Sequence, residues 1–204
     1  MTWPDKLGVL LTSPSYPQTN SDWRGVFIGR LVGALSDRLN VRLWAPPGPT
    51  PDSVTYVCTS AEQSFLVQLM QDGGISQLLR SSKARGIWSG VQLWRHLAAV
   101  YAREQSADVV HANWLQTCLG ISRSRLPLVV TALGNDMALL RIPGMIRMLR
   151  AQFSHRPVVI APNADWMAES LDKAFGRQAR IAVVPFGMDD SWYQVDRKPS
   201  VGPR

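Results

Sequence analysis

The sequence predicts an α/β domain whose central sheet is doubly wound and mostly parallel. Short runs of β-branched and apolar residues alternate with longer segments of helical periodicity along nearly the whole chain, without internal repeats. The chain has 204 residues, of which 46% are hydrophobic, enough to bury the core of one domain. This alternation favours helices packed on the faces of a parallel sheet.

The first half of the chain predicts three strands and three helices. Strands are expected at residues 6–12, 40–45 and 54–57, and the first of them ends in a loop rich in Pro, Ser and Asn. Helices are expected at residues 25–38, 62–70 and 87–104. In the last of these, apolar side chains recur at helical spacing at Ile87, Val91, Trp94, Ala98 and Tyr101.

The second half continues the same alternation. Strands are expected at residues 109–112, 128–131, 158–161 and 181–184. A short helix is expected near residues 116–122, and longer helices at residues 143–153 and up to Phe175. We expect Asn163 to cap the last helix and Gly176 to end it.

Polar residues follow two neighbouring strands of the predicted sheet. The stretch from Asp108 ends in His111, Asn113 and Trp114, and the stretch from Leu128 ends in Asn135 and Asp136. Because parallel α/β sheets bind ligands at the carboxyl ends of their strands, these residues are expected to line one crevice.

Each of these polar residues suits more than one role. Amides bond hydroxyls and an indole face covers C–H surfaces, so Asn113 and Trp114 suit sugar recognition, although Trp114 also suits core packing. His111 suits a base, a ligand or a buried hydrogen-bonding group. Asp136 is expected to combine capping of the following turn with bonding of a hydroxyl.

Three glycines lie four positions apart at the start of the first predicted helix. Gly29 and Gly33 are expected to let that helix pack closely on the sheet. Gly25 lies at the junction of loop and helix, where free amides and the helix dipole favour a phosphate, and Arg24 beside it adds a charged fork.

Net charge is +7, and acidic residues are missing from long parts of the middle of the chain. A basic segment there holds Arg80, Lys83, Arg85, Trp88 and Arg95. Such a segment suits an anionic membrane surface or nucleic acid, or is simply a solvated surface. Nucleic acid leaves the polar strand ends unexplained and is not expected as a partner.

Cysteine usage and hydropathy add three expectations. Cys58 and Cys118 lack metal-ligand spacing, so no metal site is predicted and both are expected to be reduced, mostly buried thiols. No apolar run approaches the roughly 18 residues that a membrane span needs. The first residues do not resemble a secretory signal, and a cytoplasmic location is expected.

Five motifs in order resemble glycosyltransferase family 4, most closely its bacterial enzymes of lipopolysaccharide and exopolysaccharide synthesis. They are D-W-R-G, D-V-V-H-A-N-W, V-V-T-A-L-G-N-D, I-A-P-N and V-V-P-F-G-M-D, within a match from Leu7 to Tyr193. The family consists of retaining transferases of the GT-B fold, in which two Rossmann-like domains face a cleft. The resemblance implies one half of that fold: residues 1–193 as the amino-terminal acceptor domain and 194–204 as a linker or tail.

The resemblance also implies roles for particular residues. Arg24, Gly25, His111, Asn113, Trp114, Gly134, Asn135 and Asp136 are expected to bind substrate, and Phe186 and Gly187 match the crossing between domains. The donor would be a nucleotide-sugar, with no other cofactor, and the acceptor a glycan or a lipid-linked molecule. The protein is expected in the cytoplasm or at the inner face of the membrane.

This chain departs from the family in two ways. The family's donor domain carries two Glu residues separated by seven others. Glu62, Glu104 and Glu169 are the only glutamates here and no two have that spacing, so the donor domain is expected to be absent. Leu133 stands where many relatives have a His that contacts the transferred sugar. The chain is therefore expected to be an acceptor half, either truncated or completed by a separate donor-domain polypeptide, or else a non-catalytic binding or scaffold module. A dehydrogenase domain is disfavoured because G-x-G-x-x-G is missing.

Overall fold

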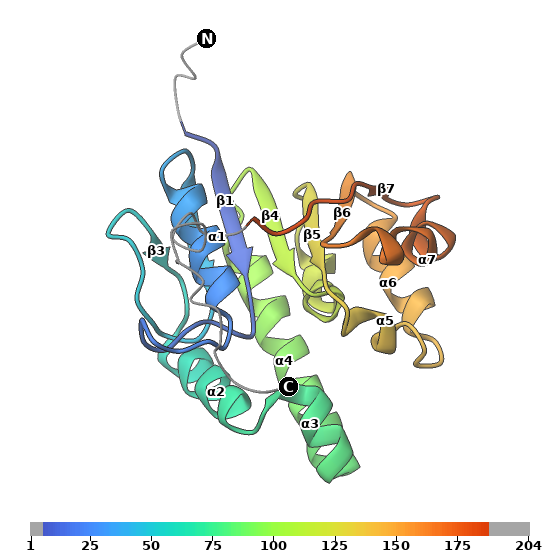
Figure 1. The fold of residues 1–204 in the computed structure, drawn as a ribbon, viewed down its shortest axis with the longest axis horizontal. Coiled ribbons are helices and arrows are strands. Elements are labelled where there is room, and N and C mark those ends of the chain that lie inside the picture. Colours follow the sequence, from blue (N-terminus) through green and yellow to red (C-terminus); the bar gives the residue numbers. More distant parts are fainter. Residues whose placement is uncertain (1–5, 188–204) are drawn as a thin grey trace, which may run out of the picture.

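The computed structural model describes residues 6–187, which form an α/β fold around one sheet of seven parallel strands. The strand order is β3-β2-β1-β4-β5-β6-β7 (Figure 1). The strands are β1 (Gly8–Thr12), β2 (Asn40–Trp44), β3 (Thr55–Tyr56), β4 (Val109–Asn113), β5 (Leu128–Ala132), β6 (Val158–Pro162) and β7 (Arg180–Ile181). The predicted Rossmann-like, doubly wound class is confirmed, and the order reverses direction at β1, between β2 and β4.

Helices cover both faces of the sheet. They are α1 (Val26–Ser36), α2 (Ser60–Gln71), α3 (Gly74–Ser81), α4 (Lys83–Arg103), the 3-10 helix η1 (Leu115–Arg123), α5 (Asp136–Leu139), α6 (Met145–Phe153) and α7 (Asp165–Phe175). The first helix, α1, packs on one face through Ile28 and Val32. The larger core on the other face joins α2, α4, η1, α6 and α7. Its largest buried side chains include Trp44 and Tyr101.

The sequence missed helix α3. It begins at Gly74, with Gly73 as its N-cap, and both glycines have positive φ. Two glycines in a row predict a break between elements rather than a helix. Leu78 is nevertheless buried, and Leu79 packs so closely on α4 that a Cβ on Gly86 would lie 2.7 Å from it. Helix α4 consequently begins at Lys83, one turn earlier than predicted.

Three local predictions are wrong. The N-cap of α7 is Ala164, not Asn163, and no side chain caps that helix. Gly33 would meet nothing within 4 Å if it carried a Cβ, and Gly29 approaches Pro17 of the preceding loop, so this spacing does not serve close packing on the sheet. The last strand ends at Ile181 instead of residue 184. Ala182 and Val184 still donate backbone hydrogen bonds to β6, but they do not extend the regular strand.

After β7 the chain runs back across the sheet toward β1 and α1 (Figure 1). Phe186 there stacks against Phe27 of α1, with ring centroids 5.0 Å apart. The predicted boundary at residue 193 and the tail over 194–204 lie outside the described residues. None of the helices of the described part is long and apolar enough to cross a membrane.

Candidate functional site

A groove of about 790 Å³ lies at the carboxyl edge of the sheet. Neighbouring strands bring their following loops together there, because β4 and β5 pair in parallel with Asn113 opposite Thr131. Helices α3 and α5 also lie on the side to which the strand arrows point (Figure 1). The predicted site residues that line this groove are Arg24, Gly25, Trp114, Asn135 and Asp136.

Asp136 joins the two loops that form the floor of the groove. Its carboxylate accepts hydrogen bonds from the Leu115 amide at 2.9 Å and from the Leu133 amide at 2.8 Å. Only 2% of the residue is exposed, and burial raises the pKa of the carboxyl to about 6, against the effect of these two bonds. Both oxygens hold backbone, so Asp136 shapes the groove and caps the turn after β5.

Trp114 has an unusual backbone. Its φ is 68°, and it is the one non-glycine residue of the described part with positive φ. The Thr131 carbonyl accepts its amide proton at 3.0 Å, and its own carbonyl accepts the Thr117 hydroxyl at 2.8 Å. Such strain concentrates at functional sites and is held by the surrounding bonds. The indole ring meets Phe27 edge-on at 5.8 Å.

Gly25 is the N-cap of α1 and needs the space that glycine leaves. Its φ is 68°, and a Cβ would lie 2.9 Å from both the Ser15 hydroxyl and the Tyr16 amide. Arg24 beside it is already engaged, since its Nε and Nη2 donate to the Asp22 carboxylate at 3.0 and 3.3 Å. These bonds lower the pKa of Asp22 to about 2. An anion at Gly25 would therefore compete with Asp22 for Arg24.

His111 and Asn113 do not line the groove. Both belong to β4, on the face opposite the side chains of Val110 and Ala112 in the larger core. The His111 Nε2 lies 2.8 Å from the Thr131 hydroxyl, and burial lowers its pKa to about 4.

The Asn113 side chain is fully buried. Its Nδ2 donates to the Thr12 carbonyl at 3.3 Å. Its Oδ1 has no hydrogen-bond partner within the described part. The buried Asn113 amide therefore contacts the protein core and is not accessible to a sugar.

Leu133, Gly134, Phe186 and Gly187 lie at the same edge but do not line the groove. The Leu133 amide is bound to Asp136, while Gly134 is exposed beside the Trp166 ring. Phe186 is 43% exposed and reaches the groove indirectly, through Phe27, which does line it. Phe27 lies within the helix predicted at residues 25–38 and was not among the predicted site residues.

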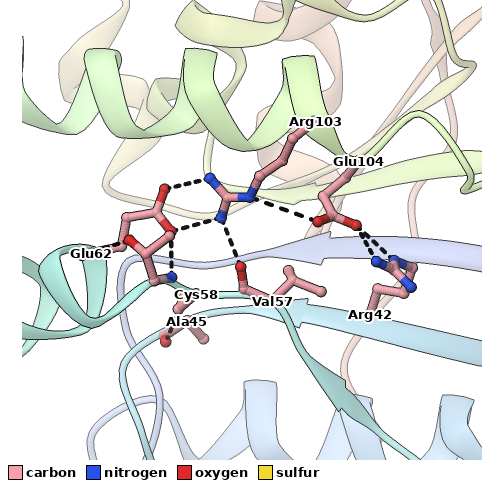
Figure 2. A network of polar contacts seen from close by, with 8 residues as sticks. Arg42, Ala45, Val57, Cys58, Glu62, Arg103 and Glu104 are labelled. Carbon is pink, nitrogen blue, oxygen red and sulfur yellow. Dashed lines mark hydrogen bonds and ion pairs between the residues drawn. The ribbon is translucent and has the colours of Figure 1, made fainter.

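The opposite wall of the groove comes from α2 and α3, which the sequence did not assign to the site. A polar network anchors α2 to α4 and to the strands (Figure 2). Glu62 forms a two-pronged ion pair with Arg103, with distances of 2.9 and 2.7 Å, and also accepts the Thr59 amide proton at 2.8 Å. These contacts outweigh burial and lower the pKa of Glu62. Thr59 and Glu62 form a capping box, a sequence signal that could have placed this helix start.

The network continues to the sheet. Arg103 also donates to the Val57 carbonyl at 2.7 Å and lies 3.7 Å from Glu104, whose carboxylate accepts from Arg42 at 2.7 Å (Figure 2). Glu62 and Glu104 are both buried, so these pairs fix α2 and α4 relative to β2. Among residues 6–187, no cluster of three or more His, Cys, Asp or Glu could hold a metal ion.

In comparisons with known proteins, no family model matches the chain, and no curated protein matches it significantly. The resemblance drawn from the five motifs therefore stays a prediction. The geometry offers hydrogen-bonding side chains, notably Arg24, Gln116 and Asn135, above a floor fixed by Asp136. Such groups bind hydroxyls and other polar groups of a ligand.

Proposed function

We propose that this chain is the acceptor-binding half of a retaining glycosyltransferase that acts in the synthesis of cell-surface polysaccharide. The observation that carries the proposal is the groove, which gathers Arg24, Gly25, Trp114, Asn135 and Asp136 from three of the motifs. Its position outside the carboxyl ends of the strands, beside the point where the strand order reverses, is typical of ligand sites in such sheets.

In this proposal the chain holds the acceptor, a glycan or a lipid-linked molecule. The nucleotide-sugar is held by a donor domain outside residues 1–204, on a separate polypeptide or elsewhere in the same protein, and no other cofactor takes part. Phe186 and Gly187 would lie next to that partner, because Phe186 stacks on Phe27 at the groove. We place the protein at the inner face of the cytoplasmic membrane, on the basic segment around α4.

A second candidate is a non-catalytic module that binds sugar or lipid, or acts as a scaffold. Two observations favour it. Leu133 stands where relatives have a His, and both oxygens of Asp136 are committed to backbone amides. This candidate keeps the groove and its ligand but loses the transfer step.

Sugar transfer distinguishes the two candidates. We expect no transfer from a nucleotide-sugar by the chain alone, and transfer to a lipid-linked acceptor when a donor-domain polypeptide encoded beside it is added. Asn135→Ala should reduce that transfer, because Asn135 lines the groove and is exposed, whereas Asn20→Ala in an exposed loop should not. Transfer by the chain alone would contradict the half-enzyme proposal. Acceptor binding without transfer in the mixture would favour the second candidate.

A further inference from the structure

The amino edge of the sheet carries a row of arginines at β5, β6 and β7. These three strands are parallel neighbours, so the segments that lead into them lie side by side at that edge. The segments are residues 123–127, 154–157 and 176–180, and none of them contains an acidic residue. We call their arginines the amino-edge row, which consists of Arg123, Arg125, Arg156, Arg177 and Arg180.

The charges of this row are not neutralised within the described part of the chain. Its four exposed members, all but Arg156, form no hydrogen bond or ion pair there, whereas Arg42 and Arg103 are paired with buried glutamates. Arg156 is half-buried, and its Nε donates to the Gln152 carbonyl at 3.1 Å. Its Nη1 is buried and has no partner among residues 6–187, so its charge adds to the positive potential of this edge.

Helix dipoles explain only part of the row. Helices η1, α6 and α7 end at this edge, and a cation in the last turn of a helix is favourable. Arg123 is such a cation in η1. Arg125 and Arg180 lie beyond the ends of η1 and α7, where the dipole has little effect. A row of exposed arginines with no acid among them is therefore a surface complementary to an external anion.

The spacing of the row matches the carboxylates of an extended peptide. Neighbouring strands lie about 4.8 Å apart, so the row spans roughly 10 Å from β5 to β7. Acidic side chains at alternate positions of an extended chain project from one face about 7 Å apart, so two or three of them cover this length. The guanidinium fork binds a carboxylate through two parallel hydrogen bonds, which gives such a contact geometric specificity.

Nucleic acid and lipid fit this edge less well. The three segments contain no Phe, Tyr or Trp, so they offer neither the aromatic platforms on which bases stack nor the aromatic anchors of a membrane interface. The row also lies at the opposite end of the strands from α3 (Figure 1). Helix α3 leads into the basic segment that we place on the membrane, so the row faces away from that surface.

We propose that the amino-edge row binds an extended acidic segment of a partner protein. Alternate Asp or Glu side chains of that segment pair with Arg125 at β5 and with Arg177 and Arg180 at β7. The five residues of β5 separate the two edges of the sheet by about 16 Å. The partner can therefore bind while the groove holds its own ligand, and the inference does not depend on the proposed function.

Two fluorescein-labelled peptides of equal length test the inference, one a Glu-Ser repeat and the other a Gln-Ser repeat. Fluorescence anisotropy measures their binding to the whole chain at low and at physiological salt. We expect the Glu-Ser peptide to bind, less tightly as salt rises, and the Gln-Ser peptide not to bind. The double variant Arg125→Glu/Arg180→Glu should bind the Glu-Ser peptide at least about tenfold more weakly, because each exposed pair contributes up to about fivefold.

Arg147→Glu is the matched control. Arg147 is exposed in the first turn of α6, toward the other edge of the sheet, and its substitution should change the affinity by less than about twofold. Both arginines of the double variant are exposed, so it should unfold at the same urea concentration as the original chain.

Three results would overturn the inference. The first is a Glu-Ser peptide that does not bind. The second is equal weakening by Arg147→Glu and by the double variant, because net charge alone would then explain the binding. The third is another partner for the row: a single-stranded oligonucleotide of equal charge that binds more tightly than the peptide, or phosphatidylglycerol vesicles that the double variant no longer binds.

Discussion

Asp136 offers the sharpest test of how the groove is built. Asp136→Ala removes the acceptor of the Leu115 and Leu133 amides and leaves two backbone donors without partners. Each buried donor left unpaired costs about 1–3 kcal/mol. Leu133 is only half-buried, so water can reach its amide and reduce that part of the cost. We expect the free energy of unfolding to fall by about 2–4 kcal/mol near pH 5.

The same residue gives the effect a pH dependence. Burial raises the pKa of Asp136 from 3.8 to about 6. A carboxyl whose pKa is raised on folding contributes most stability below its unfolded pKa, and the contribution falls as pH rises through the folded pKa. The full fall is about 3 kcal/mol, and about 1 kcal/mol of it lies between pH 5 and pH 7. The difference between the original chain and Asp136→Ala should therefore be larger at pH 5 than at pH 7.

Urea unfolding followed by circular dichroism at both pH values measures these free energies. Asn135→Ala is the matched control, because Asn135 is the exposed neighbour of Asp136, and it should change stability by less than about 0.5 kcal/mol. An Asp136→Ala chain as stable as this control would refute the claim that the Asp136 carboxylate holds the two loops together. A difference that grows from pH 5 to pH 7 would refute the raised pKa.

Four further predictions follow from the same geometry. Gly25→Ala should lower the free energy of unfolding in urea by at least about 1 kcal/mol, because Gly25 has a positive φ and the new Cβ would collide with Tyr16. Gly134→Ala should be nearly neutral, because a Cβ there would lie 3.7 Å from the Trp166 ring. Glu62→Gln should cost about 1–3 kcal/mol, because the buried Glu62 loses its charge-assisted bonds to Arg103, which keeps Glu104 and the Val57 carbonyl as partners. Glu169→Gln in an exposed pair should cost less than about 0.5 kcal/mol. Burial raises the pKa of the Cys58 thiol to about 12, so Cys58 should react with iodoacetamide at pH 8 far more slowly in the folded chain than in the urea-unfolded chain. Equal rates would contradict this prediction. The chain should sediment with phosphatidylglycerol vesicles, and salt should weaken this binding. Arg85→Glu should weaken it too, whereas Arg177→Glu should not, since each basic residue near an anionic surface contributes about 1 kcal/mol. Equal binding to neutral vesicles would contradict this prediction.

The sequence predicted the strands and their role better than it predicted the side chains of the site. Strand-end position was enough to place Trp114, Asn135 and Asp136 at one edge, because parallel strands share their carboxyl edge. It failed for His111, which already lay inside the predicted strand at residues 109–112, and for Asn113, because β4 extends to that residue. Both side chains follow the alternation of the strand. For Asn113, a strand longer by one residue decides whether the side chain is free to contact a ligand or is buried against the sheet.

Longer-range features were not visible in the sequence. The positive φ of Trp114 is held by a bond to Thr131 of the neighbouring strand β5 as well as by one to the nearby Thr117. The groove wall from α3 was missed because Gly73 and Gly74 conceal the helical spacing of Ile75, Leu78 and Leu79. The pairing of Arg24 with Asp22 follows from loop geometry that neither residue type dictates.

Chemical-shift mapping tests most directly the claim that the ligand site is the groove at the carboxyl edge. The ¹⁵N-labelled chain is titrated with octyl β-glucoside while backbone and indole resonances are followed. We predict saturable shifts at Gly25, Trp114, Asn135 and Ala138, with little change at the opposite edge of the sheet. Shifts centred instead on Asn40, Arg42 and Asp108, which line a smaller pocket at the amino ends of the strands, would contradict the claim.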